Sequence, residues 1–462
     1  MGAERKPSPN PKLAAVIAEA GFTYEALARA VSRVAVENGD PKQTNKSAVT
    51  HWVRYGVMPS GNTGTYLAEA LSRKLKRLVS LAEIGLPEPS RDLLDWRTDT
   101  LSALADLRRI DVDANRRRAV GAVAYSAAAL ALPGAGWWTS MAERGGRRST
   151  PGSRSIGRGD LEAVRDMAAL FSRMDQRHGG GHARTAVVQY LTTDVSAYLQ
   201  GTFKDDNVRR ELYGAAGELA YLSGWMAFDN GEHATAQRHF TVAVKLAAEA
   251  DDPPLAAHVL RAMAHQAIDL GHNKQALDLA TASVDGQRYA LASPREKALL
   301  GVVHARSLAA TGQHQAAMAA LLKAEDQLAA ATPGDDEPSR VFFFQEASLA
   351  HETASALRDI GELDAAVREF QRSVRTRRAT TFTRTHAVTL GYLGQVQARQ
   401  NNIEEACGTW SAALDAMDGV RSGRTRQAAA DMRSALSPFR RRGIRAINDV
   451  DARAADYLAA TS

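Results

Sequence analysis

The residues of this 462-residue chain that could support catalysis, metal binding or phosphate binding are twelve histidines, one cysteine and a run of three glycines. The histidines are dispersed, with neither an H-E-x-x-H motif nor carboxylates at metal-ligand spacing. The glycines at 179–181 lack the strand and the Lys-Ser/Thr of a phosphate-binding loop, so we expect an ordinary loop there. Cys407 has no second cysteine to pair with, and we expect it to pack in a helix interface. We therefore expect no enzymatic activity, no cofactor and no bound metal.

The charge of the chain is unevenly distributed, although the net charge is only +6. Residues 1–90 and 91–160 each carry 12 basic and 8 acidic side chains, whereas residues 161–420 carry 25 and 32. The tail at 421–462 carries 9 and 4. Two basic ends around an acidic middle favour a polyanion as the partner of at least one end. The excess at each end is modest, so ordinary variation of surface charge is the alternative.

Composition and length indicate a globular protein of two or three units. Hydrophobic residues make up 45% and charged residues 24%, which excludes wholesale disorder, and a single cysteine fits a reducing cytoplasm. No run of 18 apolar residues occurs, so we expect no membrane partner. The Ala-rich segment Val120–Leu132 follows three arginines, as in a twin-arginine export signal, but it lies too far from the N-terminus. We expect this segment to be a buried helix.

No window of the sequence alternates as a strand would, and Ala, Leu, Arg, Glu and Gln dominate, so we predict an all-α fold. Two closely spaced prolines after residue 86 end a first unit. The Gly-, Ser- and Arg-rich stretch 143–159 indicates a flexible basic linker, and 331–340 indicates a polar loop. We therefore divide the chain into residues 1–88, a helical connector and linker at 89–159, and a helical array at 160–462.

Internal repeats are the strongest pattern in the sequence. From about residue 210, pairs of helices recur in steps of 40, 41, 49 and 40 residues, and the long step contains the 331–340 loop. A small residue marks the first helix of each pair, at Gly224, Ala264, Ala305, Ala354 and Gly394. A turn residue follows seven positions later, at Gly231, Gly271, Gly312, Gly361 and Asn401. The second helix then carries a small, a mostly bulky and another small residue, at 236, 240 and 243 in the first pair and at the same spacing in the others.

This pattern resembles the tetratricopeptide repeat, lengthened by several residues. In such a repeat, small residues let the two helices of a hairpin touch, glycine or asparagine tolerates the turn, and the larger residue fills the seam between hairpins. The resemblance implies an α-solenoid over 160–462. We expect degenerate hairpins at 160–178 and 183–200 before the five units, and helices near 424–458 that cap the array.

Tetratricopeptide arrays rarely catalyse, and the first helices of their pairs line a concave surface that binds peptides or proteins. Counted in register, the inward positions hold a basic strip with an aromatic end. The residues that we assign to effector binding are Tyr221, Trp225, Arg261, His265, Arg306, His351, Arg358 and Gln395. Such a strip suits a peptide or protein effector with carboxylates and an apolar anchor. For each of these residues, a solvated surface position is the alternative.

Residues 10–85 indicate a bundle of about five short helices. The first begins at Asn10 and Pro11, and the second begins at Thr23. These segments resemble the helix-turn-helix of the phage-repressor-like (XRE) family, in which a T-x-x-x-L-A helix precedes a helix ending in W-x-x-G-x-x-x-P. The matching residues are Thr23, Leu27, Ala28, Val49, Trp52, Gly56 and Pro59.

The resemblance implies that Val49, Trp52 and Val53 face the bundle and that the outer edge of their helix enters the DNA major groove. Arginine reads guanine, Ser, Thr and His reach base edges or phosphates, and lysine supplies charge. The residues assigned to double-stranded DNA are Lys42, Lys46, Ser47, Thr50, His51 and Arg54. Flanking phosphates are assigned to Lys12, Arg73, Lys74, Lys76 and Arg77. A solvated helix edge is the alternative.

The combination of such a head and such an array resembles actinobacterial regulators of development and antibiotic production of the NsdA type, and the peptide-responsive RRNPP regulators. The resemblance implies a cytoplasmic, DNA-binding transcriptional regulator whose array binds a peptide or protein effector. One short recognition helix covers few base pairs, so we expect a homodimer on paired half-sites, with the array as its dimer surface. The alternative is a tetratricopeptide interaction scaffold whose head is a structural bundle without specific DNA binding.

Overall fold

The computed structural model describes residues 8–38, 40, 43–87, 95–107, 125–148, 154–332, 337–442 and 444–461. Helices dominate this part of the chain, and its β-structure is a parallel pair of two-residue strands, β1 (Ser155–Ile156) and β2 (Thr202–Phe203). The prediction of an all-α fold is therefore confirmed. Within the same residues, no helix combines the length and the apolar character that a membrane crossing needs.

The N-terminal unit consists of four helices around a hydrophobic core of their own. They are α1 (Pro11–Glu19), α2 (Tyr24–Glu37), α3 (Lys46–Arg54) and α4 (Thr63–Leu75). The first two begin where the sequence predicts, because the side chains of Asn10 and Thr23 accept hydrogen bonds from N–H groups of the first helical turn. The prediction of a fifth helix before residue 86 is wrong. Residues 81–85 form turns instead, since so short a segment gains too few hydrogen bonds to sustain a helix.

The described part of the connector contains a helical stretch at 100–107, the 3-10 turn η1 (Ala128–Leu130) and α6 (Ala135–Arg147). The prediction of an α-helix over Val120–Leu132 is wrong for residues 125–132, although Tyr125 is buried there as expected. Pro133 explains the difference, because a proline removes a backbone donor and restricts the residue before it to extended conformations. Residues 120–124 lie outside the described part of the chain.

The expectation of a flexible linker over 143–159 is also wrong for the residues described. This stretch supplies the end of α6, the strand β1 and the start of α7 (Arg158–His178). Arg148 is held between two carboxylates, those of Glu249 and Asp99, with its Nε 2.6 Å from the Glu249 oxygen. One of the arginines that suggested a solvated linker is therefore fixed to the folded array by charge-assisted hydrogen bonds.

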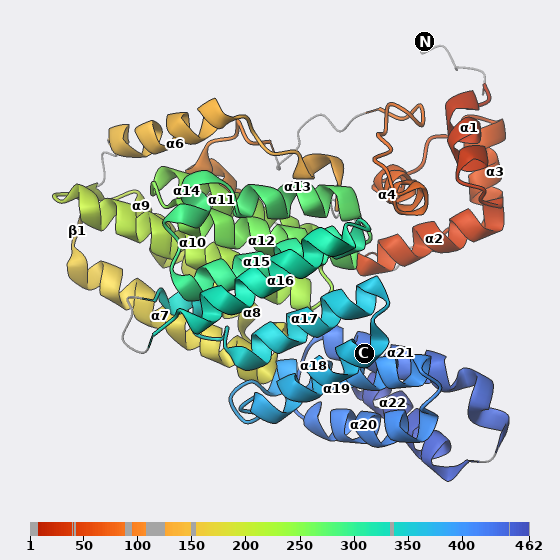
Figure 1. Ribbon diagram of the computed structural model, residues 1–462. Coiled ribbons are helices and arrows are strands. Elements are labelled where there is room, and N and C mark those ends of the chain that lie inside the picture. The colour runs from red at the N-terminus through yellow and green to blue at the C-terminus, as the bar shows by residue number, and fades with distance from the viewer. Residues whose placement is uncertain are drawn as a thin grey trace.

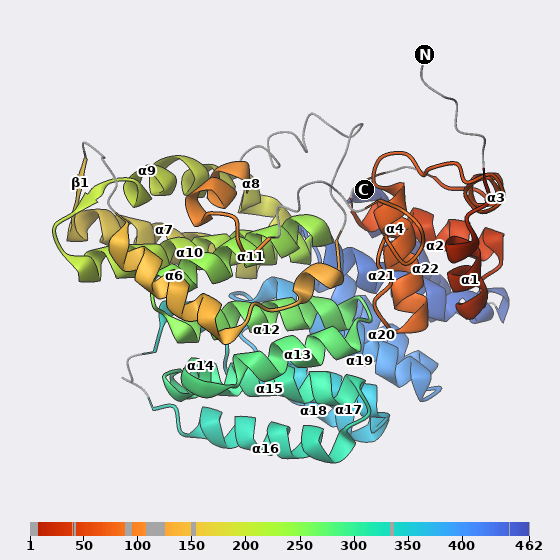
Figure 2. The same ribbon diagram turned by 90° about the horizontal axis from the view of Figure 1, so that it is seen from above.

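The remaining helices form the array. They are α8 (Gly180–Tyr190), η2 (Leu191–Val195), α9 (Ser196–Leu199), α10 (Asp206–Asp229), α11 (His233–Glu249), α12 (Pro253–Asp269), α13 (Asn273–Ser283), α14 (Gly286–Ala290), α15 (Pro294–Ala310), α16 (His314–Ala329), η3 (Ser339–Val341), α17 (Glu346–Ile360), α18 (Leu363–Thr376), α19 (Thr383–Arg399), α20 (Ile403–Ala416), α21 (Gly423–Leu436), η4 (Ser437–Arg442) and α22 (Arg445–Ala460). From α10 onward, consecutive long helices pair into hairpins that pack on one another, ending with α21–α22. Figures 1 and 2 show this succession of layers.

The marker residues of the five predicted units occupy corresponding positions in five successive helical hairpins. The turn residues Gly231, Gly271, Gly312, Gly361 and Asn401 all have positive φ, which glycine adopts without strain and asparagine tolerates. The small residues Ala236, Ala276, Ala317, Ala366 and Ala406 are fully buried in the second helices. A Cβ atom added to Gly224 would lie 2.8 Å from the Phe240 ring, so α10 and α11 approach closely only because this residue is glycine.

The array closes on itself through its first and last hairpins. α7 packs against α10 and also against α19. Arg384 of α19 donates hydrogen bonds to Asp229 of α10 at 2.7 Å and to Asp175 of α7 at 2.9 Å. The N–H of Arg421, just before α21, donates to the carbonyl of His178 at the end of α7. α7 also contacts η3, and residues of α7 and of the segment around η3 line a cavity at the inner surface of the array, which both therefore cover.

Candidate functional site

The first candidate site is the outer edge of α3. Asn45 caps this helix, and its side chain accepts a hydrogen bond from the N–H of Ala48 at 2.9 Å. Val49, Trp52 and Val53 are buried in the core of the N-terminal unit, as predicted. The residues assigned to DNA lie outside this core. Thr50 is half-buried, and the exposed residues are Lys46, Ser47, His51 and Arg54. Lys42 lies outside the described residues.

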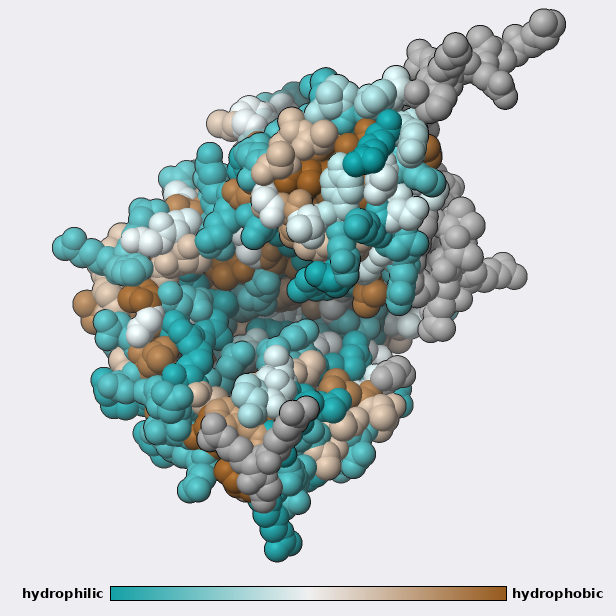
Figure 3. All heavy atoms as spheres, turned by 90° about the vertical axis from the view of Figure 1, so that its right-hand side faces the viewer, coloured by the Kyte–Doolittle hydropathy of each residue, from teal (hydrophilic) through white to brown (hydrophobic). Residues whose placement is uncertain are grey.

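The surface beside this edge is partly apolar. Tyr55, Val57 and Met58 follow α3 directly, and each is about half exposed. The rings of His51 and Tyr55 meet edge to face, with their centroids 5.5 Å apart. α3 lies on the side of the N-terminal unit that faces away from the array (Figure 1). Figure 3 views this end of the molecule and shows a hollow between the N-terminal unit above and the C-terminal hairpins below.

Two of the arginines assigned to flanking phosphates are neutralised within the protein. Arg73 lies 2.6 Å from a carboxylate oxygen of Glu37 and 2.8 Å from one of Glu69. Arg77 lies 2.7 Å from Glu19 and pairs with a second carboxylate as well. Both arginines are therefore engaged by carboxylates of the protein itself, Arg73 in a largely buried position and Arg77 at the surface. The lysines assigned with them are exposed, at Lys12, Lys74 and Lys76.

The N-terminal unit is attached to the array through α4. The carboxylate of Glu69 lies 2.6 Å from His272 Nε2, in the turn between α12 and α13, and both residues are buried. Burial would raise the pKa of Glu69, but hydrogen bonds and charge from His272 and Arg73 outweigh it and lower this pKa. Tyr125 stacks on the His272 ring, and its N–H donates to the side chain of Asn38. α3 takes no part in these contacts and is free to face another molecule.

The second candidate site is the inner surface of the array. All eight residues assigned to the effector lie on the first helices of hairpins, from α10 to α19. Two adjacent cavities lie along this surface. Four of the assigned residues line one or both of them, namely Tyr221, Trp225, Arg261 and His351. The other four line neither cavity, namely His265, Arg306, Arg358 and Gln395.

The assigned arginines that lie outside the cavities are bound by the protein's own carboxylates. Arg306 is buried, and its guanidinium lies 3.3 Å from Asp269 and from Glu352 and 3.9 Å from Asp359. Arg358 lies 2.8 Å from the carboxylate of Asp359. Both arginines are therefore paired within the protein, and neither lines a cavity of the inner surface.

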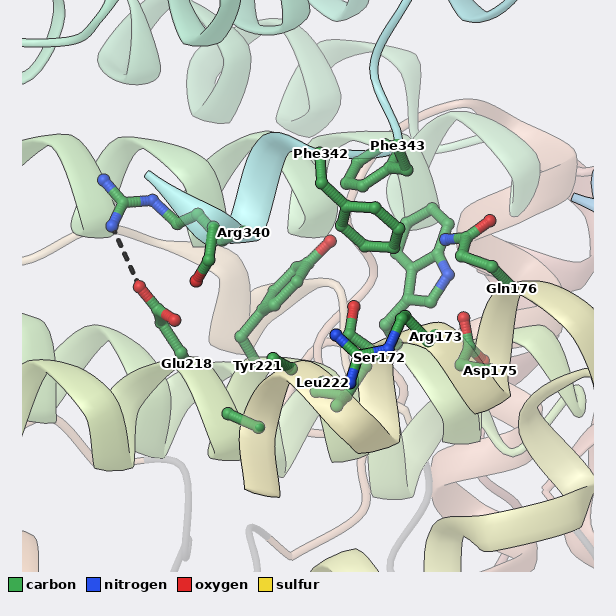
Figure 4. Close-up of a pocket in the computed structure, with 14 residues that line it drawn as sticks. Ser172, Arg173, Asp175, Gln176, Glu218, Tyr221, Leu222, Arg340, Phe342 and Phe343 are labelled. Carbon is green, nitrogen blue, oxygen red and sulfur yellow. Dashed lines mark hydrogen bonds and ion pairs between the residues drawn. The ribbon is translucent and has the colours of Figure 1, made fainter. Parts of the chain in front are cut away.

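The first cavity has a volume of about 190 Å³ and lies between α7, α10 and the segment around η3 (Figure 4). Its apolar side is formed by aromatic rings, among them those of Tyr221, Trp225 and Phe342. At its other end, Arg340 donates a hydrogen bond to Glu218 at 3.1 Å. Arg340 also binds both carboxylate oxygens of Glu296, so the segment that covers the cavity is anchored by ion pairs.

The second cavity has a volume of about 60 Å³ and shares Gln176, Trp225 and Phe343 with the first. Its charged lining consists of one carboxylate, Glu352, and four arginines, Arg261, Arg377, Arg384 and Arg424. The pKa of His351 lies well below its ordinary value, because burial and the neighbouring arginines disfavour a further positive charge. At neutral pH the histidine is therefore uncharged and the arginines supply the positive potential.

Sequence reasoning missed three of these four arginines. Arg384 lies in the first turn of α19, more than two turns before the position where inward residues were counted. Arg377 follows α18, and Arg424 belongs to α21, which was expected only to cap the array. The repeat could have indicated Arg424, because the register of first helices continues into a sixth hairpin, which α21 begins. The covering side chains Gln176 and Phe343 come from segments outside the repeats and carried no such signal.

The cysteine and the glycine run that were considered for chemistry have packing roles. Cys407 is buried in a hydrophobic cluster, as expected. The prediction of a loop at 179–181 is wrong, because Gly179 alone links α7 to α8 and the next two glycines begin α8. A Cβ atom on Gly180 would lie 2.3 Å from the carbonyl oxygen of Met226, so close packing requires glycine there. Among the described residues, no group of three or more His, Cys, Asp or Glu side chains is placed to hold a metal ion.

Comparison with known families gave a match within the N-terminal unit. Residues 13–87 match the family model described as the SP15 N-terminal domain. The match therefore spans α1 to α4, including the exposed edge of α3, and stops before the connector. The comparison with curated proteins gave no match.

Proposed function

We propose that this protein is a DNA-binding transcriptional regulator, without enzymatic activity, whose array receives an effector at its inner surface. The single observation that carries the proposal is the two-sided character of α3. Its apolar residues are buried in the core, while Lys46, His51 and Arg54 are exposed. The helix itself lies on the side of the N-terminal unit away from the array (Figure 1). This is the arrangement by which a recognition helix enters the major groove, as the resemblance to XRE-like helix-turn-helix units implies.

In this proposal, the exposed side chains of α3 and of the residues after it bind different parts of the DNA. Arg54, in the last turn, is long enough to donate two hydrogen bonds to a guanine. Lys46 and Ser47, in the first turn, lie next to the free N–H groups of the helix terminus and are suited to a phosphate. The exposed apolar side chains of Val57 and Met58 offer contact with a thymine methyl group.

The array supports a regulatory role through its contact with the N-terminal unit. Arg261 on α12 lines the second cavity, and the turn after the same helix carries His272, which binds Glu69. One helix therefore connects the inner surface to the DNA-binding unit. A tetratricopeptide-like array that bound an effector at this surface could alter the position of α4 and, through it, that of α3.

The proposal is tested by measuring DNA binding with full-length protein and genomic fragments selected by it, at about 50 and 200 mM salt. Arg54→Ala should weaken binding to the selected fragment by roughly 5- to 150-fold, because one good base contact is worth about 1–3 kcal/mol. Its thermal unfolding should be unchanged, since exposed substitutions shift stability by less than about 0.5 kcal/mol.

The matched control is Arg147→Ala, which removes the same charge from an exposed position on α6 at the far side of the molecule. It should bind the fragment as the wild type does. Equal losses in both variants would contradict a role of Arg54 in readout. Weak, sequence-independent binding by the wild type would instead support an interaction scaffold.

A further inference from the structure

Three of the four arginines in the second cavity have no carboxylate partner among the described residues. Only Arg384 is neutralised, by Asp175 and Asp229. Arg261 donates instead to the neutral groups Tyr221 Oη and His258 Nε2, at 2.9 and 3.0 Å. Arg377 likewise donates to the backbone carbonyl of residue 347 at 2.8 Å and to a serine hydroxyl at 3.0 Å. The third arginine is Arg424, whose guanidinium lies over the ring of Phe228. Burial lowers its pKa, but Tyr392 and the charges of Asp269 and Asp229 outweigh burial and raise it, although neither carboxylate is within ion-pair distance.

These guanidiniums also keep unused donors inside the protein. Arg261 and Arg377 are 2% and 8% exposed, and the Nε atoms of both lack a hydrogen-bond partner in the described structure, as does that of Arg424. Burial and repulsion from Arg384 lower the pKa of Arg377 to about 10, in spite of attraction from Glu352. Arg261 and Arg377 are therefore buried cations without a carboxylate within ion-pair distance, and such charges destabilise a fold.

A bound anion would supply the missing counter-charge. The arginine fork donates pairs of N–H groups at the spacing of carboxylate and phosphate oxygens, and such bonds are strong when water is excluded. The first cavity lies next to the second, which holds the arginines. Trp225, Gln176 and Phe343 line both cavities. Aromatic walls of this kind favour a planar apolar group.

We propose that the two cavities form one effector site for a small aromatic anion, whose carboxylate or phosphate binds Arg261, Arg377 and Arg424. Its ring lies in the first cavity, against Trp225, Tyr221 and Phe342. This inference rests on the proposed effector-binding role of the array, and it narrows the effector from a peptide or protein to a small molecule.

The closure of the array favours a small molecule over an extended peptide. α7 and the segment around η3 lie across the inner surface, and each is anchored by ion pairs, through Asp175 and Arg340 respectively. The two cavities, of about 190 and 60 Å³, together are smaller than a typical drug-sized pocket of roughly 300 Å³ or more. One ring with one anionic group matches this volume, whereas a peptide of several residues would have to displace the covering elements.

The test is the thermal unfolding of the full-length protein, without DNA, in the presence of defined probes at constant ionic strength. The probes are phenyl phosphate, phenylacetate, inorganic phosphate, phenol and a hexapeptide ending in phenylalanine. We expect phenyl phosphate or phenylacetate to raise Tm by about 2 °C or more, inorganic phosphate less, and phenol not at all. The aromatic anion that raises Tm more shows whether the site prefers a phosphate or a carboxylate. A larger shift with the hexapeptide, or none with either aromatic anion, would overturn the proposal.

Two variants distinguish this site from general anion binding. Arg377→Met and Arg261→Met should unfold at or above the Tm of the wild type without probe, because each removes an uncompensated buried charge. Both should bind the aromatic anion at least about tenfold more weakly, as the loss of one charge-assisted hydrogen bond predicts. Agreement between two variants guards against a folding defect in either one.

Arg148→Met is the matched control, since it removes a largely buried arginine that is paired with carboxylates and lines neither cavity. It should lower Tm and leave the probe-induced shift unchanged. An equal probe response in all three variants would contradict the proposal. Because the assay contains no DNA, failure of DNA binding by α3 would leave its result unaffected, and the two proposals can fail separately.

Discussion

The packing of the fifth hairpin makes a sharp prediction about one substitution at two glycines. Gly394 and Gly408 lie inside α19 and α20, the two helices of one hairpin. A Cβ atom on Gly394 would lie 2.5 Å from Nε1 and 2.6 Å from Cδ1 of Trp410, whose indole is fully buried. A Cβ atom on Gly408 would meet nothing within 4 Å.

The two changes should therefore have opposite signs. Alanine in place of a glycine inside a helix stabilises by about 0.5–1 kcal/mol when nothing opposes it, which is the expectation for Gly408→Ala. Gly394→Ala receives the same gain, but overpacking in a core costs about 1–3 kcal/mol. The upper end applies here, because the Trp410 ring is enclosed and its Nε1–H already donates to the carbonyl of Gly391 at 3.1 Å. We expect a net loss of about 2 kcal/mol.

Thermal unfolding of the two full-length variants beside the wild type measures this difference. Gly408→Ala should raise Tm and Gly394→Ala should lower it, by about 2–4 °C per kcal/mol for domains of moderate size. The pair controls for helix propensity, since the residue change and the hairpin are the same. An equal or higher Tm for Gly394→Ala would refute the close contact of α19 with Trp410, and with it the register on which the repeat assignment depends.

Two further predictions concern acid stability and assembly. Burial would raise the pKa of Glu296, but the charge of Arg340 and hydrogen bonds from His258 and Arg340 lower it from an ordinary 4.5 to about 2. A carboxyl with a lowered pKa stabilises the fold at pH values above its pKa in the unfolded chain, and this stabilisation is lost as pH falls toward its pKa in the folded protein. Between pH 7 and pH 3 the loss here is about 2 kcal/mol. Chemical unfolding should show this loss in the wild type and not in Glu296→Gln, and equal acid sensitivity would contradict it. On its specific DNA site the protein should have the mass of a dimer by light scattering, and a monomeric mass would exclude paired half-sites.

Much of the fold follows from local patterns. The caps at Asn10 and Thr23, the buried face of α3 and the register of the five hairpins depend on residues within one or two helices of each other. The sequence therefore predicts them. The sequence also places Trp225 and Arg261 on the inner surface, because their positions follow from the repeat.

The closure of the array could not be predicted in the same way. The bonds of Arg384 to Asp175 and Asp229 join residues 209 and 155 positions apart, and no periodicity relates them. Whether an arginine is free or paired depends on such distant partners. Arg306 and Arg261 both belong to the predicted basic strip, yet they differ in the structure. The same reason explains why the inner surface was expected to be an open groove.

The connection between the two candidate sites has a thermodynamic consequence. α12 carries Arg261 at the cavity and leads directly to His272, which binds Glu69 of the N-terminal unit. If an anion at Arg261 changes the position of this helix and thereby the affinity of α3 for DNA, DNA must change the affinity for the anion by the same factor. The selected DNA fragment should therefore change the affinity for phenyl phosphate by a certain factor. Phenyl phosphate should change the affinity for the DNA fragment by the same factor. Glu69→Gln keeps a hydrogen-bonding side chain but removes the charge that binds His272. In this variant, the affinity ratios for phenyl phosphate and for DNA should both approach one. Loss of one ratio while the other persists would show that the helix does not connect the two sites.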